Sequence, residues 1–303
     1  MKFEVTILGS GSSLPTVNRN STAQFVECNN RFILIDCGEG TQIQLRKYKV
    51  KFQKLDLVLI THLHGDHFYG LPGLISSMHL LGRDKKLLIV GPKELESLIR
   101  PLLDVGGHRL SFELEFLALA YPEQKIVFED RKVKISCFPL KHRIPTHGYL
   151  ICEKGPEFKL NKVAFDVFQL RLTDIPKIKR GEDIVAPNGQ RVANHLLVLQ
   201  PRAEKKYAFC SDTKFTESIL PFISGVDLLY HEATFTNEHQ VRAKQTFHST
   251  AEDAAKIALQ ASVKQLLIGH FSPRYSSLQD HENQAKTIFN NVMLAEDGLL
   301  MKI

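Results

Sequence analysis

The sequence predicts an α/β fold built as a four-layer αβ/βα sandwich, with two sheets packed face to face and helices on their outer sides. Two long stretches alternate strand-like and helix-like segments, and a more polar middle separates them. In both stretches, His and Asp residues cluster where apolar strands end. At 303 residues the chain is long for one domain, but α/β folds reach this length as one unit. We therefore expect a single domain over residues 1–303, with an insertion at about 153–200.

The first stretch begins with a strand at residues 3–8, followed by a hairpin. The dipeptide Asn29-Asn30 favours a tight turn, so residues 24–27 and 32–36 are expected to pair. The pattern then predicts, in order, a helix at 41–47, a strand at 55–60, a helix at 74–81, a strand at 87–90, a helix at 93–103, and strands at 113–118, 125–128 and 133–140.

The second stretch repeats this arrangement after the polar middle. The pattern predicts strands at 206–210, 226–230, 265–268 and 299–301, and helices at 250–260 and 282–290. Ser249 or Thr250 is placed to cap the first of these helices. The middle contains prolines such as Pro156 and Pro176 and a basic run at 177–181, so we expect hairpins or loops on the surface.

Composition places the chain among globular proteins. Hydrophobic residues make up 43% and charged residues 24%, and no apolar run approaches the ~20 residues that a membrane span needs. The N-terminus has no signal-peptide pattern, and the five cysteines are odd in number and lie in apolar segments. These features predict buried thiols and a cytoplasmic location. A net charge of +6 favours a phosphate-rich partner but does not identify a reaction.

The densest chemistry lies in the segment from Thr61 to His67, directly after a predicted strand. His62 and His64 alternate, so an extended backbone directs both side chains to one side. Gly65 permits a sharp turn, after which Asp66 and His67 can face a neighbouring point. Imidazole and carboxylate together suit zinc, with manganese and iron as competitors. Four ligands from one loop exceed what a single catalytic metal takes from one segment, so we infer two metals.

Other candidate ligands follow apolar segments that are predicted to be strands. His142, Asp212 and His270 each follow such a strand, and strand ends commonly line one rim of an α/β fold. This predicts His62, His64 and His142 on one ion, Asp66, His67 and His270 on the other, and Asp212 between them. A lone His at a strand end is more often structural than a ligand, and that alternative stays open for His142 and His270. We interpret His147, which adjoins an expected turn at Gly148-Tyr149, as structural, and His108 and His281 as surface or loop positions.

The segment His62–His67 matches the H-x-H-x-D-H signature and resembles hydrolases of the metallo-β-lactamase fold. That motif alone does not separate lactamases, thioesterases, sulfatases and nucleases. Further blocks resemble the ribonuclease Z family, in the correct order and over most of the chain. These blocks are 32–42, 70–74, Lys141-His142 with Gly148-Tyr149, Ser211-Asp212-Thr213, the HEAT-like 231–235, the HST-like 248–250 and 269–275.

Two segments depart from the family's pattern. The family's P-x-K-x-R-N loop, implicated in sensing the tRNA 3′ end, is matched by residues 15–20, with Val17 in place of the lysine. The resemblance implies substrate contacts for Arg19 and Asn20 there, and for Arg274 in the last block. The family's tRNA-binding arm is matched by the insertion, but Gly155-Pro156 lacks its expected surroundings. In this arm Lys177, Lys179 and Arg180 are expected to contact RNA phosphates, the alternative being a solvated charged face.

The resemblance implies a zinc-dependent endoribonuclease that removes the 3′ trailer from precursor tRNA as a homodimer. Two zinc ions per chain would activate a water, with Asp66 as general base. His248, oriented by Glu232, is the expected proton donor to the leaving 3′-oxygen, because a carboxylate behind an imidazole favours its protonated form. The alternative for Glu232 is to orient His231 or a ligand.

Three other functions remain open from the sequence. The nearest is a general phosphodiesterase or exoribonuclease on the same scaffold, which the departures at Val17 and in the arm leave open. A lactonase, thioesterase or sulfatase has no need of the HEAT-like and HST-like blocks. A tRNA-binding protein without catalysis conflicts with the apparently full set of metal ligands.

Overall fold

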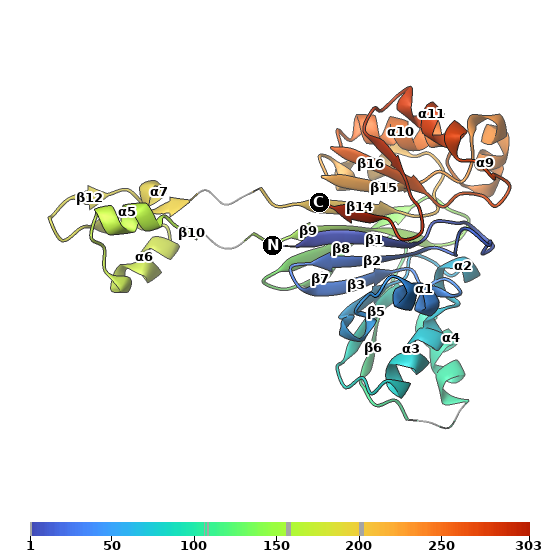
Figure 1. Ribbon diagram of the computed structural model, residues 1–303, viewed down its shortest axis with the longest axis horizontal. Coiled ribbons are helices and arrows are strands. Elements are labelled where there is room, and N and C mark those ends of the chain that lie inside the picture. Colours follow the sequence, from blue (N-terminus) through green and yellow to red (C-terminus); the bar gives the residue numbers. More distant parts are fainter. Residues whose placement is uncertain (1, 106, 108, 156–158, 200–202) are drawn as a thin grey trace. The chain divides into compact units, whose positions relative to one another are not determined.

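The computed structural model describes residues 2–105, 107, 109–155, 159–199 and 203–303 (Figure 1). The chain forms two compact units, one of residues 1–153 with 205–303 and the other of residues 154–204. The expected insertion of about 153–200 overlaps the second unit. Within the described part of the chain, no helix has the length and apolar character needed to cross a membrane.

The first unit contains two seven-stranded sheets. The first has, in spatial order, β18 (Leu300–Lys302), β1 (Phe3–Gly9), β2 (Ala23–Cys28), β3 (Arg31–Ile35), β4 (Leu57–Leu59), β5 (Leu87–Pro92) and β6 (Leu114–Leu119). The second has β17 (Val292–Leu294), β16 (Gln265–Gly269), β15 (Leu228–Glu232), β14 (Lys206–Cys210), β9 (Thr146–Glu153), β8 (Val133–Leu140) and β7 (Lys125–Glu129).

Helices cover the outer face of each sheet in this unit (Figure 1). The first sheet carries α1 (Thr41–Lys47), α3 (Leu71–Leu80) and α4 (Leu95–Asp104), which share an apolar cluster with it. The second carries α10 (Ala251–Gln260) and α11 (Gln279–Lys286). The remaining helical segments of the unit are η1 (Phe52–Lys54), α2 (Gly65–Phe68), η3 (Glu217–Ile219), α8 (Leu220–Ile223), η4 (Asn237–His239) and α9 (Gln240–Thr246). One large core joins the facing sheets, so the predicted α/β sandwich is confirmed.

Several predicted elements agree with the structure in detail. The Asn29-Asn30 turn joins β2 to β3, and both asparagines have positive φ, as a tight hairpin requires. Thr250 is the N-cap of α10, and its hydroxyl accepts a hydrogen bond from the backbone N–H of Asp253 at 3.2 Å. The five cysteines are free thiols, and all except the partly exposed Cys152 are buried.

Two local expectations are wrong. Gly148 and Tyr149 lie within β9 rather than in a turn, and a Cβ on Gly148 would stand 2.9 Å from the Phe209 carbonyl oxygen. Glycine is therefore required by close strand packing. His281 is fully buried in α11 instead of on the surface, because this helix begins at Gln279, earlier than expected. His108 lies outside the described residues.

The second unit, residues 154–204, is small. Its elements are the strand pairs β10 (Lys159–Leu160) with β13 (Val198–Leu199) and β11 (Ile184–Val185) with β12 (Arg191–Val192), and the helices α5 (Lys162–Val167), η2 (Leu172–Asp174), α6 (Ile175–Lys179) and α7 (Asn194–Leu197). Its core contains Ala164, Leu170, Ile178, Ile184, Ala186, Val192 and Leu197. Pro156, named with the expected insertion, lies outside the described residues.

Strand direction places the candidate residues at one edge. β14, β15 and β16 are parallel, and β8 runs in the same direction because both β8 and β14 pair antiparallel with β9. Their carboxyl ends therefore meet at the same edge of the second sheet, and each end leads into one of the predicted ligand or acid segments.

Candidate metal centre

The segment after β4 is extended and then turns into a short helix. His64 is the N-cap of α2 with φ −77° and ψ 144°, so His62 and His64 precede the helix, and Asp66 and His67 lie in its first turn. This is the change of backbone direction expected at Gly65.

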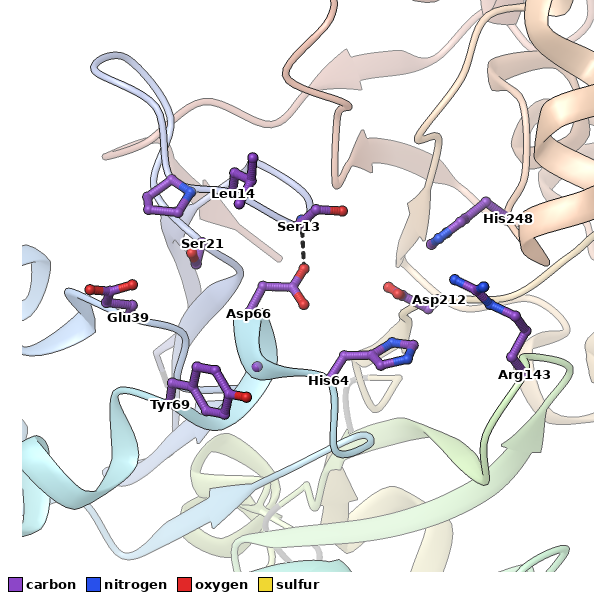
Figure 2. A pocket seen from close by; sticks show the side chains of 12 residues that line it. Ser13, Leu14, Ser21, Glu39, His64, Asp66, Tyr69, Arg143, Asp212 and His248 are labelled. Carbon is purple, nitrogen blue, oxygen red and sulfur yellow. Dashed lines mark hydrogen bonds between the residues drawn. The ribbon is translucent and has the colours of Figure 1, made fainter.

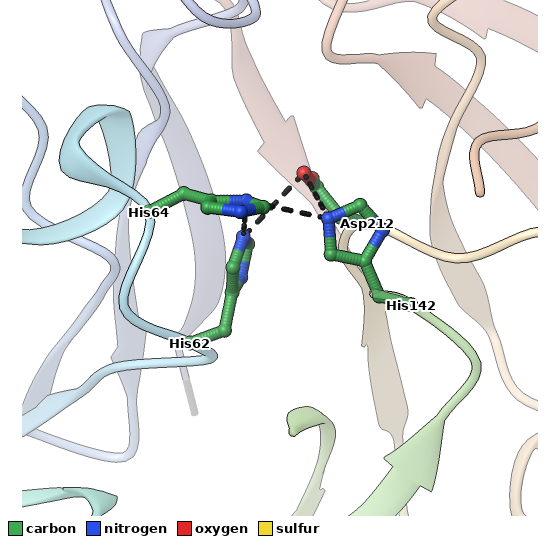
Figure 3. Close-up of side chains that lie close together, drawn as sticks. All are labelled: His62, His64, His142 and Asp212. Atoms are coloured by element: carbon green, nitrogen blue, oxygen red, sulfur yellow. Dashed lines mark hydrogen bonds and ion pairs between the residues drawn. The ribbon is translucent and has the colours of Figure 1, made fainter. Parts of the chain in front are cut away.

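Four predicted ligands converge on one point (Figure 3). The Nδ1 atom of His64 lies 2.9 Å from His62 Nε2 and 3.3 Å from His142 Nε2. The Asp212 Oδ2 atom lies 3.5 Å from His62 Nε2 and 3.7 Å from His142 Nε2. Three imidazole nitrogens and one carboxylate oxygen thus surround a common centre, which is a ligand set for one divalent ion.

The other oxygen of Asp212 belongs to a second group. Asp212 Oδ1 lies 3.4 Å from His67 Nε2 and 3.2 Å from His270 Nε2. Asp66 Oδ2 lies 3.6 Å and 3.5 Å from the same two nitrogens. The structure therefore brings all seven predicted ligands together, with Asp212 between the two groups.

Most of the imidazoles are oriented through their second ring nitrogen. His67 Nδ1 lies 2.7 Å from Oδ2 of the buried Asp36, and His142 Nδ1 lies 2.9 Å from the Phe247 carbonyl oxygen. His270 Nδ1 lies 3.0 Å from the Thr234 hydroxyl. Such partners fix the ring plane and leave the other nitrogen to face a metal. Asp36, Phe247 and Thr234 are not among the site residues predicted from the sequence.

The donor set fits a divalent cation. His67 Nε2 and His270 Nε2 are buried and have no hydrogen-bond partner in the described part of the chain, although both are aimed at carboxylates. Burial opposes a charge on His67, but Asp212, Asp66 and Asp36 outweigh it and raise its pKa well above the ordinary value. This surplus of negative charge attracts a cation. We conclude that the cluster is a divalent-metal site.

The backbone around the cluster is strained. Asp36, Phe247 and His270 have φ values of 57°, 60° and 60°, in the left-handed region that non-glycine residues rarely adopt. Each of them is a candidate ligand or contacts one. Such strain persists only where the surrounding structure enforces it, and it clusters at functional sites.

The partly buried His248 pairs with the buried Glu232 beside the candidate metal ligands. His248 Nδ1 lies 2.8 Å from Glu232 Oε1, and Glu232 also accepts the backbone N–H groups of Thr213 and Thr234. Burial opposes protonation of His248, but the charge and hydrogen bond of Glu232 outweigh it and raise the pKa of His248 to about 9. His231 instead contacts the backbone oxygen of Glu232 at 2.7 Å, so the Glu232 carboxylate is directed at His248.

A cavity of about 420 Å³ opens beside the cluster (Figure 2). Its lining includes Asp66, Asp212 and His248, together with side chains that the sequence analysis did not select: Ser13, Leu14, Pro15, Ser21, Glu39, Tyr69 and Arg143. Arg143 directly follows the ligand His142, and Tyr69 follows the ligand segment by two residues. That adjacency was the available signal, but only the folded chain shows which neighbours face the cavity.

The predicted substrate contacts are dispersed. Arg19 donates to the Tyr275 carbonyl oxygen, and the Asn20 side-chain amide donates to Asp297 at 2.8 Å. Arg274 is exposed and lies over the ring of Phe235, 5.1 Å from its centre. The remaining three are exposed residues at the end of α6 in the second unit, Lys177, Lys179 and Arg180. None of the six lines the described cavity.

Comparisons with known proteins identify the class of protein. Residues 3–154 match the family model of the anti-Pycsar protein Apyc1, and residues 150–271 match the beta-lactamase superfamily domain. Fold, metal cluster and these matches define a hydrolase of the metallo-β-lactamase superfamily.

Relatives that align over the full length of the chain identify its family within this superfamily. The chain is 46% identical to ribonuclease Z of Parabacteroides distasonis over 301 residues, covering 99% of each chain. It is 44% identical to ribonuclease Z of Porphyromonas gingivalis over 297 residues, covering 98% of each. The crystal structure of human tRNase Z, short form, superposes with a TM-score of 0.71 at 27% identity, covering 98% of each chain. The chain belongs to the ribonuclease Z family.

Proposed function

We propose that this protein is a zinc-dependent endoribonuclease that cuts the 3′ trailer from precursor tRNA and leaves a 3′-hydroxyl on the tRNA. The observation that carries the proposal is the position of Asp212. Its two carboxylate oxygens face two separate groups of candidate ligands, in a chain that belongs to the ribonuclease Z family. Shared carboxylates of this kind are typical of two-metal phosphodiester hydrolases.

Two Zn²⁺ ions per chain fit these groups, with Mn²⁺ or Fe²⁺ as alternatives. His62, His64 and His142 would hold one ion, Asp66, His67 and His270 the other, and Asp212 both. When bound, the ions supply charge that polarises the phosphodiester and lowers the pKa of an attacking water.

Side chains of the protein handle the protons. Asp66 is held by the Ser13 backbone N–H, which donates to its Oδ2 at 2.7 Å, and we assign it as the general base that accepts the proton of the water. His248 engages Glu232 through Nδ1 and so leaves Nε2 to protonate the leaving 3′-oxygen. His248 must be protonated before it can donate a proton, and the Glu232 carboxylate stabilises this imidazolium form.

Arg143 adds a fixed positive charge to this pocket. Its side chain lies on the same side as Asp212 and His248 (Figure 2). A guanidinium matches phosphate oxygens in a bidentate geometry. We assign Arg143 to a phosphate next to the scissile bond.

RNA outside the pocket would meet exposed cations. Lys177 and Lys179 are exposed on α6, whereas Arg180 is partly neutralised by Glu182 at 2.7 Å. Contacts with phosphates fix position and shape rather than sequence. We further propose, from the family resemblance, that the protein acts in the cytoplasm as a homodimer and that Arg19, Asn20 and Arg274 lie near the RNA end.

The position of Val17 favours a second candidate. Val17 is fully exposed where the family has a lysine, so the loop offers no cation at this position to sense the RNA end. A broader phosphodiesterase or exoribonuclease on the same site is therefore the alternative.

The test is to incubate the zinc-loaded protein with a 3′-extended precursor tRNA and to map the products. A single internal cut next to the discriminator base, lost in Asp66→Ala and after chelation, is the expected result. Stepwise shortening of the trailer, or turnover of bis-p-nitrophenyl phosphate without any cut in precursor tRNA, would favour the alternative instead.

A further inference from the structure

Tyr69 presents an aromatic ring at the cavity in a fixed orientation. The residue is 66% exposed, although it directly follows the turn that carries Asp66 and His67. Its ring lies flat against Gly65, where an added Cβ would stand 2.2 Å from ring atom Cε2. The Phe68 ring packs at 5.0 Å with an interplanar angle of 65°. One face of Tyr69 is thus supported by the metal-binding loop, and the residue lines the cavity.

The cavity has two unlike walls (Figure 2). His248, Asp212 and Arg143 form one wall, while Tyr69, Glu39 and the turn at Ser13 lie across from them. Among the described lining residues, Arg143 is the single fixed cation. The wall around Tyr69 therefore offers a ring, a carboxylate and a hydroxyl, which do not attract phosphate but can accommodate a base.

The direction of the proposed reaction indicates which part of the RNA meets each wall of the cavity, and this step rests on the proposed function. His248 protonates the 3′-oxygen of the tRNA body, so the body reaches the cavity from the wall of His248 and Arg143. The first trailer nucleotide is joined to the same phosphorus through its 5′-oxygen and diverges from the leaving oxygen. Its base is then directed to the opposite wall.

We propose that Tyr69 is a stacking platform for the base of the first trailer nucleotide. Stacking on an aromatic ring tolerates any sequence, because every base has a π-face. This property suits an enzyme whose trailers differ from one precursor to another. The support from Gly65 means that little side-chain entropy is lost on binding.

The test combines a protein change with a substrate change. Single-turnover kcat/KM is measured for wild type, Tyr69→Phe, Tyr69→Leu and Tyr69→Ala on a precursor tRNA whose first trailer nucleotide is either normal or abasic. We expect loss of the base to slow wild type and Tyr69→Phe by at least about fivefold. In Tyr69→Leu and Tyr69→Ala the normal substrate should be slowed to the same extent, and loss of the base should add less than about twofold.

Controls separate stacking from damage to the metal loop. Zinc content should be unchanged in Tyr69→Leu, which fills the space beside Gly65 without a π-face, and its rate on the abasic precursor should stay within about twofold of the wild-type rate on that precursor. Tyr121→Ala, an exposed tyrosine outside the cavity lining, should retain the full sensitivity to the abasic nucleotide.

Two results have distinct meanings. If the effects of Tyr69→Leu and of the abasic nucleotide multiply independently, the platform is excluded while the proposed function stands. If wild type cuts no precursor tRNA at all, the proposed function itself fails, and this is visible before any variant is made.

Discussion

The metal cluster and the unit of residues 154–204 differ in how firmly they hold their functional side chains. In the cluster His67, His142 and His270 each have a second partner, and seven candidate ligands converge from four segments of the chain. In the small unit the expected RNA contacts are exposed, and one of them pairs with its own neighbour Glu182. Water activation requires atoms fixed to within a fraction of an ångström, whereas phosphate attraction requires only charge at the surface.

The sharpest test of the cluster is Asp212→Ala. This change removes one ligand from both groups, so we expect both ions to be lost and cleavage to fall at least about a thousandfold. Metal analysis of the purified variant and cleavage of precursor tRNA measure the two effects. An active variant with a full metal content would remove Asp212 from its place between the groups.

The next largest effect is expected for His248→Ala. Loss of the proton donor should lower kcat about 10²- to 10⁴-fold with metal content unchanged. His79→Ala, a partly exposed histidine of α3 that lies outside the cluster, is the matched control. A substrate with a leaving group that needs no proton, such as p-nitrophenolate, should be affected much less. Equal losses on both substrates would argue against an acid role.

Asp36→Asn tests the orientation of a ligand rather than the ligand itself. The Asp36 carboxylate contacts His67 Nδ1 at 2.7 Å, and replacing its charge should weaken metal affinity about 10- to 100-fold. Competition with a chelator measures this affinity directly. Asp227→Asn is the control, because Asp227 also accepts a backbone N–H but lies outside the cluster. Matching affinities in the two variants would count against the role of Asp36.

The smallest effect is expected in the other region. Lys177→Ala with Lys179→Ala should raise KM for precursor tRNA several-fold and reduce the slope of log affinity against log salt by about 2. The rate on bis-p-nitrophenyl phosphate should not change. Glu182→Ala releases Arg180 from its ion pair and should shift KM slightly in the opposite direction. An unchanged salt slope would show that α6 does not meet the RNA.

The metal cluster could be predicted from the sequence because it depends on the spacing of ligands along the chain and on the direction of the strands that precede them. The run from His62 to His67 needs only alternation and a glycine turn, and Asp212 and His270 follow parallel strands that end at one edge. By contrast, Asp36 reaches His67 only through its positive φ and the pairing of β3 with β4. No pattern in the sequence encodes that contact.

Contacts that form only on folding also explain the other differences between the sequence-based predictions and the structure. Gly148 was expected in a turn, but it lies in a strand. A glycine is needed there because Phe138 and Phe209 of the neighbouring strands approach its backbone closely, and only the folded chain shows this approach. Arg143 and Tyr69 were not selected because facing a cavity is a property of the folded chain. The buried His281 was misplaced by an error of a few residues in where its helix begins.

The left-handed conformations of Asp36, Phe247 and His270 have a consequence for the life of the protein before it is loaded with metal. Each costs about 1–3 kcal/mol, so these three residues lower the stability of the metal site before it is loaded. Bound ions stabilise the folded form by mass action. We therefore expect proteases to cleave the metal-free protein sooner than the metal-loaded protein.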